Sequence, residues 1–311
     1  MNPALSVVVF TTAAGAAQGL VVALAVAVLA GVPIADRSLS NALLVATVLL
    51  VGGLVSSFFH LGRPARAWRA AAMWRTSWLS REAIVLPAFI ACNALWWIAL
   101  QRAPGFARAP LLPLAAIALA GLLWFCTAMI YACLRFIEEW AQPLTVVNFV
   151  LLGLSSGLVL ASALAVLAGE GLALRAAVPA ALLATVVAGA ARAAALRRNA
   201  AIRHRSTLQT ATGIRAARLV QTSMGMSAGS FNTREFFHRA SRAAIARIKL
   251  AAIGLSFVVP ALVLGLVWAG ALPPLACTLA LLVQLPGLIA DRWLFFAQAK
   301  HPQNLYYQVV S

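Results

Sequence analysis

Residues 6–30 read SVVVFTTAAGAAQGLVVALAVAVLA and contain no charged side chain. A helix that crosses the hydrocarbon core of a bilayer needs about 20 such residues. Seven more apolar runs follow, at 39–60, 83–101, 112–135, 144–168, 174–196, 247–269 and 273–298. These runs are too long for barrel strands and do not alternate, and lipid admits only helices or closed barrels. We therefore predict an all-α, polytopic integral membrane protein with about eight transmembrane helices in a bundle.

The composition excludes an ordinary soluble domain. Hydrophobic residues make up 63% of the 311 residues and charged residues only 10%, whereas a soluble domain carries roughly 25% charged residues. The formal net charge of +17 could suggest a nucleic-acid ligand. The basic residues lie almost wholly between the apolar runs, however, where orientation signals belong. We therefore expect contact with membrane lipid and no nucleic-acid partner. Because no Lys or Arg precedes the first run, we expect it to be a retained span rather than a cleaved signal peptide.

The basic residues also predict the orientation of the chain. Of the 24 Lys and Arg residues, 20 fall on the side that holds both termini. The other four are Arg37, Arg102, Arg108 and Arg175. Basic residues are enriched in cytoplasmic loops. We therefore expect both termini and the long loops in the cytoplasm.

One loop is long enough to form a feature outside the membrane. We treat residues 1–311 as a single transmembrane domain with a basic cytoplasmic loop at about 197–246. A Gly and Ser cluster near 225–230 predicts a turn between two basic helical stretches. The loop either lies against anionic headgroups or forms a docking surface for a cytoplasmic partner.

Candidate metal and haem ligands are few. The four cysteines form no C-x-x-C pair, which argues against a zinc site or an iron–sulfur cluster in this chain. His60 is the histidine at the end of a span; His204 and His238 lie in the basic loop and His301 follows the last run. A haem between helices needs two axial ligands at membrane depth. We therefore predict no haem and no metal site.

His60 and Glu82 flank one loop, at the end of the second run and the start of the third. A quinone site needs an apolar slot, donors for the carbonyl oxygens and a group that exchanges protons. Both residues suit that chemistry. Each also has a purely structural interpretation, because a cation suits a helix C-terminus and an anion suits a first turn. In that interpretation Glu82 follows an N-cap at Ser80.

Several motifs resemble the DMSO reductase anchor subunit (DmsC-like) family. The most distinctive is SSFFHLGRPARAWRA at 56–70, followed by SWLSREA at 77–83. FTTAAGAAQGL at 10–20, SFNTREFFH at 230–238 and DRWLFFAQAKHPQNLYY at 291–307 also resemble it. The resemblance covers the chain from end to end.

The resemblance implies a function in electron transfer. Such proteins anchor three-subunit molybdenum oxidoreductases in the bacterial inner membrane. A molybdopterin catalytic subunit and a ferredoxin-like iron–sulfur subunit dock on the cytoplasmic face, and the anchor itself holds no haem or iron–sulfur cluster. Its cofactor is quinone or quinol, and His60, Glu82 and Arg63 become the candidate quinone-binding residues. The chain alone would have no catalytic residues.

The substrate of the complex is less directly implied. RWLFFAQAKHPQNLYY at 292–307 and TLQTATGI at 207–214 are more similar to anchors of sulfite oxidation than to those of DMSO reduction. Two alternatives remain open. A transporter would need polar residues along a path across the midplane, and a non-redox membrane scaffold would bind no quinone.

Overall fold

The structure is a computed structural model that describes residues 1–59, 61–223, 237–238 and 240–306. Within these residues, eight helical stretches are long and apolar enough to cross a membrane. They are α1 (Leu5–Leu29), α2 (Asp36–Phe58), α3 (Trp78–Arg102), α5 (Leu111–Ala132), α6 (Pro143–Leu167), α7 (Gly171–Ala200), the continuous stretch Arg242–Trp268, and α12 (Ala276–Ala297). The described residues form no β-strand. The predicted all-α bundle with about eight spans is confirmed.

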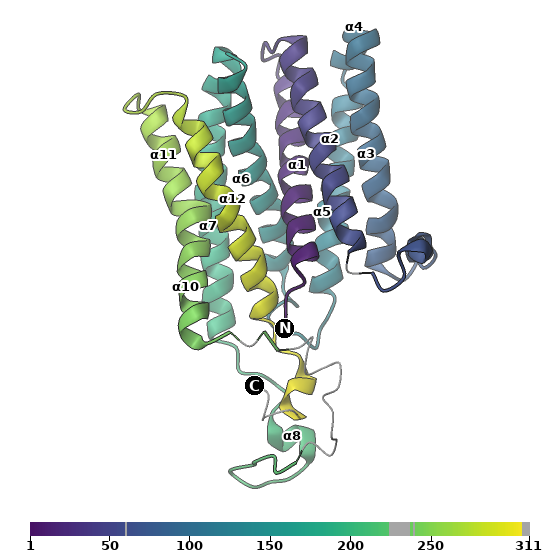
Figure 1. Cartoon of the computed structure of the whole chain (residues 1–311), viewed down its shortest axis with the longest axis vertical. Helices are drawn as coiled ribbons and strands as arrows, with labels where there is room; N and C mark the ends of the chain where they lie inside the picture. Colours follow the sequence, from purple (N-terminus) through teal and green to yellow (C-terminus); the bar gives the residue numbers. More distant parts are fainter. Residues whose placement is uncertain (60, 224–236, 239, 307–311) are drawn as a thin grey trace.

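Helix α1 lies at the centre of the bundle. It contacts α2, α5, α6 and α12, with α2 and α3 to one side and α7, α10 and α11 to the other (Figure 1). The N-terminus and the short helices α8 (Leu208–Thr212) and η3 (Pro302–Tyr306) lie at one end of the bundle (Figure 1). We call this end the terminal face. An even number of crossings returns the chain to the side where it began.

Glycine allows α1 and α6 to pack backbone against backbone. A Cβ at Gly19 would lie 1.9 Å from the carbonyl oxygen of Gly153, and one at Gly157 would lie 2.1 Å from the carbonyl carbon of Gly19. The indole of Trp124 on α5 packs against Gly153 from another side. Helices in lipid associate through close packing because the lipid supplies no hydrophobic drive between them. These small residues therefore fix the centre of the bundle.

A polar cluster joins the other half of the bundle. The stretch Arg242–Trp268 consists of α10 (Arg242–Ile253), a π-helical turn η2 (Gly254–Val258) and α11 (Val259–Trp268). The side-chain amide of Gln284 on α12 donates to Ser155 Oγ at 3.1 Å and to the carbonyl of Ser256 at 3.2 Å. Ser155 in turn bonds Thr185 Oγ1 on α7 at 2.9 Å. These fully buried contacts hold α6, α7, η2 and α12 in register.

The start of α3 differs from the prediction. The helix begins at Trp78, and Ser77 is its N-cap, with its hydroxyl accepting from the backbone N–H of Ser80 at 3.3 Å. The prediction that Ser80 is the N-cap is therefore wrong. Glu82 consequently lies inside the helix, beyond the first turn. This moves its carboxylate from the surface into the packing between helices.

The basic loop also differs from the prediction. Residues 201–223 contain only the five-residue helix α8, so the first of the two predicted basic helical stretches is wrong. A capping box between Thr207 and Thr210 starts α8, and Gly213 ends it at φ 71°. Of the second stretch, the residues from Arg242 onward form the start of α10. The turn predicted near 225–230 lies outside the described residues.

Candidate functional site

The carboxylate of Glu82 is buried between two membrane-spanning helices. Its side chain is only 6% exposed, and the hydroxyl of Thr127 on α5 donates to its Oε1. It forms no ion pair with any residue that the structure describes. A buried carboxyl group without a direct cationic partner is costly and is more typical of a functional site than of a structural one.

Of the three predicted quinone residues, the structure describes Glu82 and Arg63, and it does not pair these two. Arg63 is exposed, serves as the N-cap of η1 (Pro64–Ala71) and makes no ion pair with Glu82. His60 lies outside the described residues. Glu82 and Arg63 therefore have different surroundings, the first buried between helices and the second exposed on the loop.

Arg81, rather than Arg63, is the arginine that organises the loop before α3. Its guanidinium lies 4.0 Å from the ring centroid of Trp78 and donates to the carbonyls of Trp74 at 2.9 Å and Arg75 at 2.8 Å. The ring of Trp78 meets Phe125 of α5 edge-on at 5.3 Å. These contacts fix the loop beside the terminal-side ends of α3 and α5, next to Glu82.

A small internal cavity adjoins Thr127, the hydrogen-bond partner of Glu82. Its volume is about 10 Å³, the space that one water molecule needs. Its polar lining comes from Thr11 and Gln18 on α1, Trp124 and Thr127 on α5, and Arg292 on α12. Gln18 also donates to the carbonyl of Ala120 on α5 at 3.5 Å and so bridges two helices. The cavity brings Arg292 to the same internal site as Thr127.

Arg292 and its neighbour form a buried charged group in α12. The guanidinium of Arg292 lies 4.0 Å over the ring of Phe149, and the side chain is 5% exposed. Asp291 accepts from Nε of Arg192 on α7 at 2.5 Å, with both side chains buried. The acidic and basic pair at the end of an apolar run is visible in the sequence. Its partner on α7 and its position near Thr127 could not be predicted from the sequence.

The terminal face holds a large pocket of about 650 Å³. Three histidines line it, His204, His238 and His301. Burial lowers the pKa of His238 and of His301 below the ordinary histidine value. His204 instead lies 3.6 Å from Glu139, measured between Nε2 and Oε1. In the described part of the chain, no three metal-ligating side chains group together here or elsewhere.

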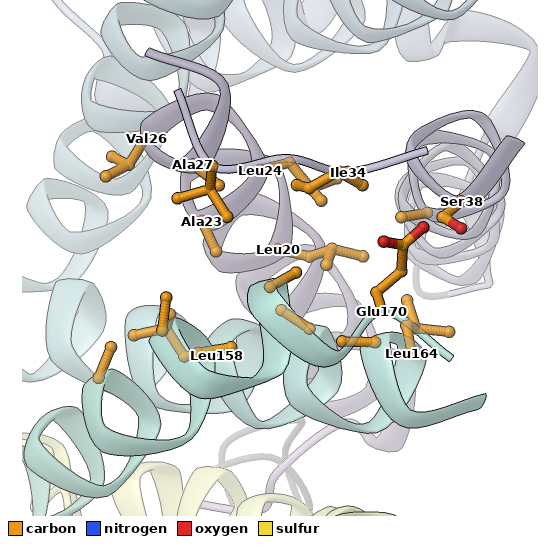
Figure 2. A pocket seen from close by; sticks show the side chains of 18 of the residues that line it. Leu20, Ala23, Leu24, Val26, Ala27, Ile34, Ser38, Leu158, Leu164 and Glu170 are labelled. Atoms are coloured by element: carbon orange, nitrogen blue, oxygen red, sulfur yellow. The ribbon is translucent and has the colours of Figure 1, made fainter. Parts of the chain in front are cut away.

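An apolar groove of about 370 Å³ lies at the opposite end of the bundle, between α1, α6 and α7. The side chains labelled in Figure 2 are hydrocarbon except for Ser38 and Glu170. Glu170 accepts a hydrogen bond from the backbone N–H of Ala35 at 3.0 Å. The groove lies toward the far end of the 25-residue helix α1, which is about 37 Å long, and so is well removed from the terminal face. It matches a site for a hydrocarbon chain.

Eight apolar helices and a buried carboxylate near one membrane face define a multi-pass membrane protein with an internal ionisable site. The chain matches the family described as DMSO reductase anchor subunit (DmsC) over residues 1–297, and it belongs to that family. It is 46% identical over 330 aligned residues to the C subunit of the sulfite dehydrogenase of Allochromatium vinosum, with 100% of both chains covered. The family predicted from the sequence motifs is confirmed.

Proposed function

We propose that this anchor subunit exchanges electrons between a membrane quinone and an iron–sulfur subunit, with Glu82, His60 and Arg63 at the quinone site. The observation that carries the proposal is the buried Glu82 carboxylate, bonded by Thr127, beside the loop that holds the other two residues. A quinone takes up two electrons and two protons when it is reduced to quinol. A buried carboxyl group can hold or release one of those protons.

The donor set fits a quinone. Glu82 offers a carboxyl group in an apolar setting, and Arg63 on the adjoining exposed loop offers N–H donors for a carbonyl oxygen. Three apolar side chains close to Arg63 or Glu82 in the sequence are exposed on the bundle surface: Phe59, Leu61 and Leu79. They suit contact with a hydrocarbon tail arriving from the lipid. The groove in Figure 2 is a poorer candidate, since it lies far from the face on which we place the partner.

We further propose that the complex oxidises sulfite, in the bacterial cytoplasmic membrane. The full-length similarity to one subunit of a sulfite dehydrogenase supports this. Sulfite and water give sulfate, two electrons and two protons on the catalytic subunit, and the electrons pass through the iron–sulfur subunit to the quinone. The excess of basic residues at the terminal face supports a cytoplasmic position for that face and would attract an acidic partner.

Glu82→Gln in the complete complex tests the proposal. Quinone-linked sulfite oxidation should fall at least tenfold, while activity with a soluble dye that accepts electrons directly from the partner subunits should persist. Glu170→Gln is the matched control, since Glu170 is a carboxylate at the opposite end of the bundle. Unchanged quinone-linked turnover in Glu82→Gln would exclude Glu82 from the site.

A further inference from the structure

Four acidic or basic side chains are buried inside the described membrane-spanning helices near the terminal face. They are Glu82, Asp291, Arg192 and Arg292. Arg192 and Asp291 pair directly. That leaves one acid, Glu82, and one base, Arg292, each without an ion pair to any described residue. The set is neutral when Glu82 is ionised and carries one excess positive charge when Glu82 is protonated. A buried charge is tolerated when an opposite charge compensates it.

The structure connects these two residues through α5. Thr127 donates to Glu82 and lines the water-sized cavity that Arg292 also lines. Thr127 therefore bonds Glu82 directly and shares one internal cavity with Arg292.

Arg292 lies between two cavities of this size. The second, also about 10 Å³, is lined by Arg292 together with Asp291, Arg192 and Asn148. Each cavity has one buried polar atom without a hydrogen-bond partner in the described structure, Trp124 Nε1 in the first and Asn148 Oδ1 in the second. The guanidinium of Arg292 likewise has no hydrogen bond to any described residue. One water in each cavity would satisfy these groups.

We propose that Arg292 is a positioning residue for the quinone site: through a water in the cavity it shares with Thr127, it stabilises the ionised form of Glu82. It thereby sets the pH range in which Glu82 exchanges protons with quinone. The inference rests on the proposed function of Glu82. Arg292 itself stays charged and touches no quinone.

Other charged or titratable groups near Glu82 and Arg292 could contribute. Arg81 lies on the helix of Glu82, Cys126 and Tyr131 lie on α5, and Asp291 and Arg192 lie on α12 and α7. The guanidinium of Arg81 is held in the preceding loop by its bonds to Trp74 and Arg75. Arg192 and Asp291 neutralise each other. Arg292 is the remaining buried cation among them.

The test is the pH profile of quinone-linked turnover in the complete complex. Glu82→Gln first identifies the limb of the profile that belongs to Glu82. In Arg292→Gln the positive charge in the cavity beside Thr127 is lost. The proposal then predicts that Glu82 holds its proton to higher pH, so its limb should move to higher pH by roughly one unit. Arg292→Lys keeps the charge and should leave the limb in place. Arg175→Gln, an exposed arginine at the opposite end of α7, is the control.

Gln18→Glu provides a second variant, because Gln18 lines the same cavity and a carboxylate there would compete for Arg292. This variant should also move the limb to higher pH. Arg292 is retained and paired in it, so the test remains possible if Arg292→Gln fails to assemble. A limb that stays in place in either assembled variant would overturn the inference, as would an equal shift in Arg292→Lys. A limb that persists in Glu82→Gln would instead show that the proposed role of Glu82 is wrong.

Discussion

Thr127 on α5 donates its hydroxyl hydrogen to the buried carboxylate of Glu82 on α3. Apart from this bond, Glu82 is buried by helix packing and makes no ion pair with a described residue. A hydrogen bond to an ionised group in such a setting contributes about 1.5–3 kcal/mol. The pair therefore controls how readily Glu82 ionises, and several measurements follow from it and from the surrounding packing.

Thr127→Val removes this hydrogen bond and nearly preserves the shape of the side chain. Without it Glu82 should hold its proton to higher pH, and the limb of the quinone-linked profile assigned to Glu82 should rise by roughly one to two pH units. Thr12→Val is the control, because the hydroxyl of Thr12 bonds only the carbonyl of Val8 in its own helix, at 2.8 Å. An identical profile in Thr127→Val and the native complex would contradict the prediction.

His60→Arg should abolish quinone-linked turnover and leave dye-linked activity intact. An arginine at this position keeps a donor but cannot exchange a proton near neutral pH. Ala72→Arg adds the same charge at an exposed position of the same loop and should have little effect. Both activities are measured on one preparation of the complex. Full quinone-linked activity in His60→Arg would remove His60 from the site.

The buried pair Arg192–Asp291 should be far more important for stability than an exposed pair. Asp291→Asn leaves a buried guanidinium without its partner and should cost about 3–5 kcal/mol. Asp36→Asn breaks the Arg108–Asp36 pair, whose side chains are 35% and 51% exposed, and should cost about 0–1 kcal/mol. Thermal unfolding of the complex in mild detergent compares the two variants. Equal midpoints would show that burial of the first pair is not decisive.

Gly157→Leu should prevent α1 and α6 from packing. A Cβ at Gly157 already lies 2.1 Å from the backbone of Gly19, so a larger side chain must separate the helices. Gly121→Leu is a matched control, because a Cβ at Gly121 meets nothing within 4 Å. The yield of complex extracted in mild detergent should fall severalfold for Gly157→Leu alone. A normal yield would mean that the helices can be spread apart at little cost.

Acidification should loosen the pocket at the terminal face. Nδ1 of His238 accepts from Ala240 N–H at 3.0 Å, and Nδ1 of His301 accepts from Gln303 N–H at 3.2 Å. Burial lowers the pKa of both rings. A locally opened pocket, in which the rings are exposed to water, therefore binds protons more tightly than the pocket in which they are buried. The stabilisation is therefore fully present above the ordinary histidine pKa of about 6.5 and is lost as pH falls below it.

Hydrogen–deuterium exchange at pH 7.5 and 5.5, corrected for intrinsic rates, measures this effect. Uptake at Ala240 and Gln303 should rise at the lower pH. The cap between Thr207 and Thr210 involves hydroxyl and backbone groups only and serves as the internal control. Equal protection at both pH values would show that the two histidines do not hold the pocket closed.

The sequence by itself determined the class of fold and the family. Eight long apolar runs can cross lipid only as helices, and this physical constraint acts on each run separately. The motif around 56–83 identified the family and pointed to His60, Glu82 and Arg63. Local sequence could also place Glu82 near a membrane face, although it assigned the N-cap to Ser80 instead of Ser77.

Only the tertiary structure decided the environment of Glu82. Its partner Thr127 lies on another helix, 45 residues away in the chain, and Arg292 reaches the same cavity from the last span. Such contacts depend on which faces of the helices meet. In lipid that choice is made by close packing, as at Gly19 and Gly157, and by a few buried polar contacts. Each span carries apolar side chains around its circumference, so the hydrophobic pattern of the sequence carries little information about which faces meet.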